Sequence, residues 1–173
     1  MNKNKQIGLL SMPVFVAALG YFVDVYDLLL FTIVRQTSVM SIGSTAETII
    51  VDSAHIINWQ MSGLLIGGIL WGVLGDKKGR LKVLFGSILL YSVANILTSF
   101  VQNVDQYAYC RFIGGIGLAG ELGAGITLVS EMLPKHKRGI GTSMVAGIGL
   151  FGAVFAYFTF KYTNDWRLCY QIG

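Results

Sequence analysis

The chain has 173 residues and a formal net charge of +4, and 13% of its residues are charged whereas 54% are hydrophobic. Soluble domains carry about 25% charged residues, so this composition excludes an ordinary water-soluble domain and indicates a protein with several membrane-spanning helices. Glycine is abundant and proline scarce, at 22 and 2 residues, which fits neither a collagen-like nor a disordered chain. Cys110 and Cys169 form no metal-binding or redox motif, and we expect no cofactor and no metal.

Long apolar runs predict the helices of an all-α membrane protein. A membrane-spanning helix needs about 20 apolar residues, and the sequence supplies five such runs and the beginning of a sixth. We predict helices over about 12–34, 57–75, 83–101, 104–130 and 140–160, with a sixth that begins near Trp166. The more polar segment from Arg35 to Asn58 is predicted to be an exposed loop or, alternatively, a small external lid.

Lys and Arg residues are unevenly distributed between the two sides that these helices define. Nine lie in the N-terminal segment and in the loops after the second and fourth helices: Lys3, Lys5, Lys77, Lys78, Arg80, Lys82, Lys135, Lys137 and Arg138. Three lie on the opposite side: Arg35, Lys161 and Arg167. Because short cytoplasmic loops carry the excess of Lys and Arg, we predict an integral protein of the cell (inner) membrane with a cytoplasmic N-terminus. The positive charge reflects this topology, and we expect no nucleic-acid partner.

Glycines recur at helical spacing in two of the apolar runs. The second run carries the small-residue pairs Gly63/Gly67 and Gly68/Gly72, and the fourth run is also rich in glycine. Small residues let helix backbones approach closely in lipid. The pattern therefore predicts close helix packing, and it is also compatible with helices that slide during transport.

Four charged residues lie within the predicted membrane helices: Asp24, Asp27, Arg111 and Glu121. Each costs about 2.5–3.5 kcal/mol at a helix centre on insertion scales, so each is expected to have a partner or a function. Asp27 and Arg111 both lie about seven residues, or about 10 Å, from the outer ends of their helices. Glu121 lies about 15 Å deeper than Arg111.

Two interpretations of these charges stay open. One is a buried ion pair between Asp27 and Arg111 that only fixes helix packing. The other is a water-lined cavity in which a carboxylate binds a proton and Arg111 binds an anion, and the excess of carboxylates favours it. The candidates for proton coupling are Asp27 first, then Glu121 and Asp24, and those for substrate binding are Arg111, Asp27 and Tyr21.

The segment after the second run reads Gly72-Val-Leu-Gly75-Asp76-Lys77-Lys78-Gly79-Arg80. Gly79 permits the positive φ angle of a tight turn, and Asp76 and Arg80 can bridge neighbouring helix ends. At every position the segment resembles the G-x-x-x-D-[RK]-x-G-R signature of the major facilitator superfamily.

Further segments resemble the same superfamily. Gly20–Leu28 resembles the first helix of its phosphate and metabolite proton symporters. The other segments are Arg111–Gly117 in the fourth helix, Ser130–Pro134 with Arg138-Gly139, and Asp165-Trp166-Arg167 before the sixth helix. The resemblance implies the N-terminal half of a twelve-helix transporter, with the C-terminal half supplied in the same or another chain. It also implies a conformational gate at the cytoplasmic helix ends, formed by Gly72, Asp76, Gly79, Arg80, Glu131 and Arg138.

The function expected from this resemblance is proton-coupled uptake of a small anionic metabolite, an organic acid, by alternating access. Its partners are the substrate, protons and the lipid bilayer. Gly123 stands where sugar and phosphate relatives often have proline. The alternatives are a uniporter, a sugar or phosphate carrier, or a truncated, half-size membrane module that does not transport alone. An enzyme is not expected, because the sequence has no metal-ligand spacing, activated nucleophile or phosphate loop.

The predicted topology can be tested by cysteine labelling of intact cells. In a protein without Cys110 and Cys169, a membrane-impermeant thiol reagent should label Ser44→Cys and should not label Lys78→Cys. Labelling at position 78 without labelling at position 44 would overturn the predicted orientation.

Overall fold

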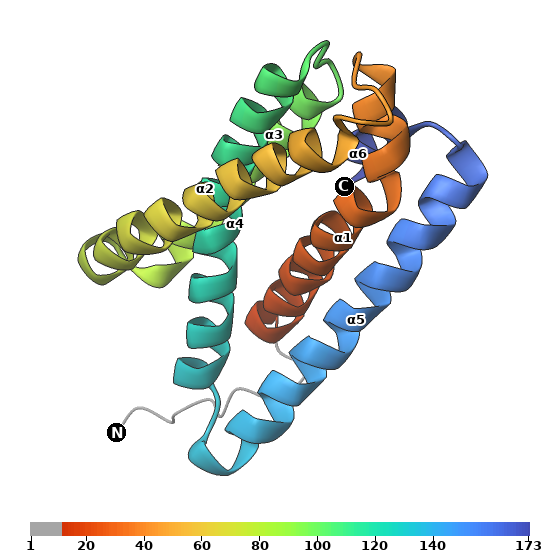
Figure 1. Cartoon of the computed structure of the whole chain (residues 1–173). Helices are drawn as coiled ribbons and strands as arrows, with labels where there is room; N and C mark the ends of the chain where they lie inside the picture. The colour runs from red at the N-terminus through yellow and green to blue at the C-terminus, as the bar shows by residue number, and fades with distance from the viewer. Residues whose placement is uncertain (1–11) are drawn as a thin grey trace, which may run out of the picture.

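A computed structural model describes the backbone of residues 12–173 and the side chains of residues 14–121 and 133–173. Within these residues the chain forms six α-helices and one short 3-10 helix (Figure 1). The elements are α1 (Met12–Ser41), α2 (Ile49–Lys78), α3 (Arg80–Thr98), α4 (Val104–Met132), η1 (Lys135–Lys137), α5 (Arg138–Thr163) and α6 (Trp166–Ile172). The predicted all-α class is confirmed.

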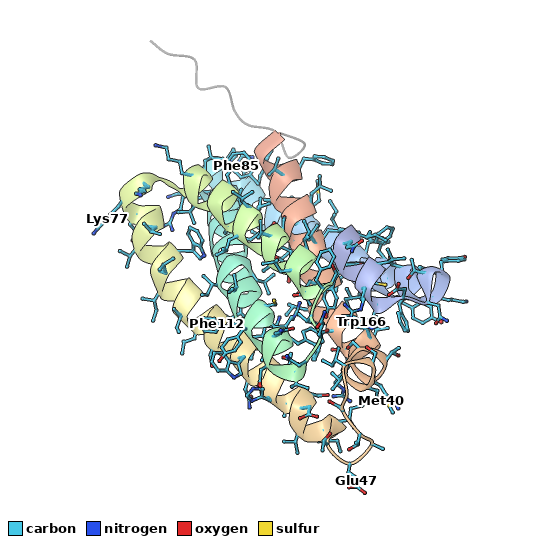
Figure 2. All side chains as sticks on the ribbon, turned by 90° about the horizontal axis from the view of Figure 1, so that it is seen from above. Met40, Glu47, Lys77, Phe85, Phe112 and Trp166 are labelled. Atoms are coloured by element: carbon cyan, nitrogen blue, oxygen red, sulfur yellow. The ribbon has the colours of Figure 1, made fainter. Side chains whose placement is uncertain are left out.

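Four helical segments of the described chain are long and apolar enough to cross a membrane. They are Val14–Ser41, Ile49–Lys78, Arg80–Thr98 and Lys135–Thr163. Their loops place Glu47 and Lys77 at opposite ends of α2 (Figure 2). The chain therefore traverses the bundle repeatedly in alternating directions, as the apolar runs predict.

The expectation of a long loop or lid from Arg35 to Asn58 is wrong. Helix α1 continues to Ser41 and α2 begins at Ile49, so residues 42–48 alone connect them. The buried residues Val34 and Ser38 continue one face of α1, and Ser53 and Ile56 begin the buried face of α2. Their helical spacing shows that both helices keep packing contacts where the sequence becomes polar, and such ends escape a search for apolar runs.

The helices pack in both parallel and antiparallel pairs: α2 with α4 and α1 with α5 run parallel, and α3 with α4 runs antiparallel. Helix α2 packs along α4, α3 also packs along α4, and α1 packs along α5, while α1 and α4 meet within the bundle. In Figure 1, α1 and α5 run side by side on one flank and α2, α3 and α4 form the other. The contact between α1 and α4 thus joins the two groups, and it brings together the helices that carry the charged residues.

Glycines permit the closest of these contacts. A Cβ atom on Gly63 or Gly67 of α2 would collide with the backbone of α4, and one on Gly115 would collide with the backbone of α2 at Gln60. By contrast, nothing lies within 4 Å of a Cβ atom placed on Gly68 or Gly72. The Gly63/Gly67 pair therefore serves packing within this chain, and the Gly68/Gly72 pair faces open space there.

Helix α6 is held to the rest of the bundle by Arg167. Its Nη1 and Nη2 atoms donate to the carbonyl oxygens of Ser99, at 2.6 Å, and Val101, at 2.9 Å. The carboxylate of Asp165 caps α6 by accepting from the Arg167 backbone amide at 2.8 Å. These contacts fix the orientation of α6, which carries Tyr170 into the core.

Close packing at Gly115 can be tested by adding one methyl group. Gly115→Ala should lower the thermal stability of the purified protein, because the methyl group meets backbone that cannot move independently. Overpacking of this kind costs about 1–3 kcal/mol.

Gly68→Ala is the matched control, since its methyl group enters open space on the same helix pair. Thermal unfolding in detergent, followed by tryptophan fluorescence, measures both variants. Equal midpoints for Gly115→Ala and the unmodified protein would contradict the packing described for α2 and α4.

Candidate functional site

Two adjoining groups of charged side chains occupy the contact between α1 and α4. Asp24 and Asp27 come from α1, and Arg111 and Glu121 come from α4. Their side chains are 0%, 1%, 2% and 5% exposed, respectively. All four residues are therefore enclosed by this chain itself, without a contribution from any other chain.

The first group is an ion pair that links three helices. The Nη1 atom of Arg111 lies 2.8 Å from Oδ1 of Asp27. Its Nη2 atom donates to Oε1 of Gln60 on α2 at 3.0 Å. The guanidinium thus ties α4 to α1 and α2 at once, and such charge-assisted bonds are the stronger hydrogen bonds of a protein.

Aromatic rings close both sides of this ion pair. The Cζ atom of Arg111 lies 5.6 Å from the ring centroid of Phe31 and 5.5 Å from that of Tyr170. Tyr107 donates from its hydroxyl to that of Tyr170 at 2.8 Å and packs edge-on against Phe31. A buried cation is stabilised by aromatic faces at such distances, so α6 also contributes to the setting of Arg111.

The ion pair leaves hydrogen-bonding capacity unused. Oδ2 of Asp27 and Nε of Arg111 have no partner among the described residues. These atoms offer one acceptor and one donor, which is the pattern required to bind a small polar molecule. In the described conformation burial closes them off from solvent.

The second group consists of two carboxyls, Asp24 and Glu121. Neither carboxylate oxygen of Asp24 receives a hydrogen bond from any described N–H or O–H group. The Glu121 carboxyl lies within hydrogen-bonding reach of it. Gly20, one helical turn before Asp24, lies directly against Glu121, because a Cβ atom there would collide with Oε1 of Glu121.

The other predicted substrate residue, Tyr21, lies against α5. Its ring fills the space that a Cβ atom on Gly149 would need. The structure thus brings Asp27 and Arg111 together as candidates, and it places Tyr21 at the contact between α1 and α5.

The predicted gate residues lie around the α2–α3 and α4–α5 junctions. Nη2 of Arg80 lies 3.1 Å from Oδ1 of Asp76, and Gly79 between the helices has a φ of +90°, which favours glycine. Nε of Arg138 donates to the carbonyl oxygen of Leu133 at 3.1 Å. The side chain of Glu131 lies outside the described residues, and Gly72 borders open space.

The sequence analysis missed three partners of Arg111: Gln60, Phe31 and Tyr170. Gln60 carried a signal, since it is a polar residue within a long apolar run. The two aromatic residues carried none, because aromatic residues are common in any membrane helix. Their role becomes visible only when α1, α4 and α6 are placed in space.

A surface cavity of the described chain is lined by residues other than these charged groups. It has a volume of about 300 Å³ and lies between α2 and α4, lined by His55, Asn58, Trp59, Ser62 and Phe112. None of the four buried charged residues lines it. This cavity therefore does not open onto the charged groups, which are buried in the described conformation.

Comparisons with known proteins agree with this architecture. A solved structure of the proton:xylose symporter XylE bound to 6-bromo-6-deoxy-D-glucose superposes with a TM-score of 0.79 at 19% identity, covering 92% of this chain and 40% of that one. This similarity shows the fold.

Two curated relatives match at the level of sequence. A Haemophilus influenzae protein named "Putative metabolite transport protein" is 32% identical over 160 residues, which are 91% of this chain and 38% of the relative. The niacin transporter NiaP of Acinetobacter baylyi is 31% identical over 162 residues, which are 91% of this chain and 36% of the relative. The chain thus spans less than half the length of these relatives.

The family model of the Major Facilitator Superfamily matches residues 17–172. This match covers α2 to α6 and nearly all of α1, including the four buried charged residues. The chain belongs to the Major Facilitator Superfamily of membrane transporters.

Proposed function

We propose that the complete protein is a secondary active transporter that couples proton movement to the uptake of a small anionic metabolite. The observation that carries this proposal is the imbalance of buried charge: three carboxyls share the α1–α4 contact with one guanidinium. A carboxyl without a basic partner at membrane depth is suited to bind and release protons. The similarity to a niacin transporter supports an organic acid as the substrate class.

The structure favours Asp24 and Glu121 over Asp27 as the proton site. Asp27 already has a cationic partner in Arg111 at 2.8 Å, so its charge is compensated without a proton. Asp24 has no such partner among the described residues. We therefore place proton exchange at Asp24 and Glu121, and we assign Asp27 to the control of Arg111.

Arg111 is the proposed anion-binding residue in a second conformation. It is enclosed in the described one, so a substrate reaches it only when the surrounding helices rearrange. An anion bound there would compete with Asp27, and protonation of the neighbouring carboxyls would favour anion binding by reducing the local negative charge. By linkage, anion binding would favour protonation by the same factor.

The proton-coupling role of Asp24 and Glu121 can be tested by transport assays in proteoliposomes. Radiolabelled nicotinate is the first probe, and other organic anions and xylose are compared with it. An inward proton gradient should drive nicotinate accumulation by the complete transporter. Asp24→Asn and Glu121→Gln should abolish accumulation against a gradient, because each removes a carboxyl needed to bind the proton, while exchange of labelled for unlabelled nicotinate persists.

Asp27→Asn provides the comparison. It leaves the buried Arg111 charge without its carboxylate, and breaking a buried pair in this way costs about 3–5 kcal/mol. We expect a lower thermal stability, recovered in part by Asp27→Asn combined with Arg111→Met.

Proton-driven accumulation that survives both Asp24→Asn and Glu121→Gln would exclude Asp24 and Glu121 as proton carriers. Accumulation that does not depend on the proton gradient would favour a uniporter.

The gate proposal concerns Asp76 and Arg80 at the α2–α3 junction. We propose that this ion pair stabilises one of two transport conformations. Asp76→Asn should then slow nicotinate transport several-fold and leave its binding affinity unchanged, since no charged group at the buried site is altered. Transport rates and equilibrium binding measured on the same preparation separate the two effects.

Lys78→Gln is the control for the gate, because it removes a charge from the same junction without altering the Asp76–Arg80 pair. A loss of affinity in Asp76→Asn at a normal turnover rate would contradict the gate role.

A further inference from the structure

The side chain of Glu121 lies against the backbone of α1 because residue 20 has no side chain. A Cβ atom on Gly20 would overlap Oε1 of Glu121 and also approach its Cδ at 3.2 Å and its Cγ at 3.4 Å. The whole end of the Glu121 side chain therefore occupies the space that any other residue at position 20 would fill.

This position directs the Glu121 carboxyl to Asp24. Residues four apart lie on the same face of a helix, one turn from each other, so Gly20 and Asp24 present a hollow followed by a carboxyl. The Glu121 carboxyl enters the hollow and reaches the Asp24 carboxyl. Two acids from different helices thus meet in a buried place, with Asp24 fully enclosed.

Two carboxylates cannot hydrogen-bond to each other without a proton, since an ionised carboxylate only accepts. No described N–H or O–H group forms a hydrogen bond with the Asp24 oxygens. The other titratable groups near it are Asp27 and Tyr91, and Arg111 is engaged with Asp27 and Gln60. A proton between the two carboxyls would satisfy this contact without any further donor.

We propose that Asp24 and Glu121 form one proton-binding site that holds a single shared proton, and that Gly20 is the positioning residue that makes this site possible. The site is separate from the Asp27–Arg111 pair, which lies further along the antiparallel helices. The inference deepens the proposed function, because it defines the proton site as a pair and not as one acid.

Infrared spectroscopy of the purified complete protein can test the shared proton. The absorption of protonated carboxyl groups is compared in the unmodified protein, Asp24→Asn and Glu121→Gln. A shared proton predicts that each substitution alone removes the whole band, because the new amide donates to the remaining carboxylate in place of the proton. Two independent protons predict that each substitution removes half of it, and this result would overturn the proposal.

Gly20→Ala tests the positioning role. The methyl group should displace the Glu121 carboxyl, so the shared-proton band should shift or disappear. Gly149→Ala is a matched control, since its methyl group meets the ring of Tyr21 on the same helix and does not meet a carboxyl. It should leave the band unchanged, as should Gly68→Ala.

A compensating variant separates positioning from general damage to the fold. Glu121→Asp shortens the acid by one methylene group, so Gly20→Ala combined with Glu121→Asp should recover a shared-proton band. An unchanged band in Gly20→Ala would overturn the role of Gly20, and so would a loss that the double variant fails to recover while thermal unfolding shows it to be folded.

The outcome is independent of transport, because the spectra need neither substrate nor a proton gradient. A shared proton in a protein that does not accumulate nicotinate or other organic anions would leave this inference intact and reject the proposed function. Proton-driven accumulation with two independent carboxyl bands would do the reverse.

Discussion

The arrangement of the bundle depends on the buried guanidinium of Arg111 and the interactions that compensate its charge. It is buried in a low-dielectric interior, where an uncompensated charge costs several kcal/mol, and it therefore requires groups from several helices at once. Asp27 supplies the charge, Gln60 a second acceptor, and Phe31 and Tyr170 the aromatic faces. Because these partners lie on α1, α2 and α6, satisfying one residue of α4 fixes four helices relative to one another.

Asp24 and Glu121, unlike Arg111, have no oppositely charged partner among the described residues. Arg111 and Glu121 are separated along α4, and the antiparallel direction of α1 matches them with Asp27 and Asp24 in reverse order. One end of the contact thus holds an ion pair whose charges cancel, and the other holds two acids whose charges do not. The ion pair stabilises the α1–α4 contact, and the two acids of the same contact are the groups to which we assign proton exchange in our proposal.

Much of this architecture could be predicted from the sequence, and the parts that could not share a physical reason. Apolar length identified the helices, and the charges within them identified Asp24, Asp27, Arg111 and Glu121. The polar ends of α1 and α2 were not predicted, because a search for apolar runs does not detect the part of a helix that extends beyond the hydrocarbon layer. The proximity of Glu121 to Asp24 also escaped, since rotation and depth along one helix do not give the crossing of two.

The long α1–α2 hairpin has a consequence for how the protein fits its bilayer. Each helix has 30 residues and is therefore about 45 Å long, whereas the hydrocarbon layer is about 30 Å thick. Both helices must tilt or extend into the headgroup region, where Arg35 and Glu47 are exposed. A change in lipid thickness would alter the tilt of α1 and α2. Membrane composition would therefore affect the helices that hold Arg111 and its partners.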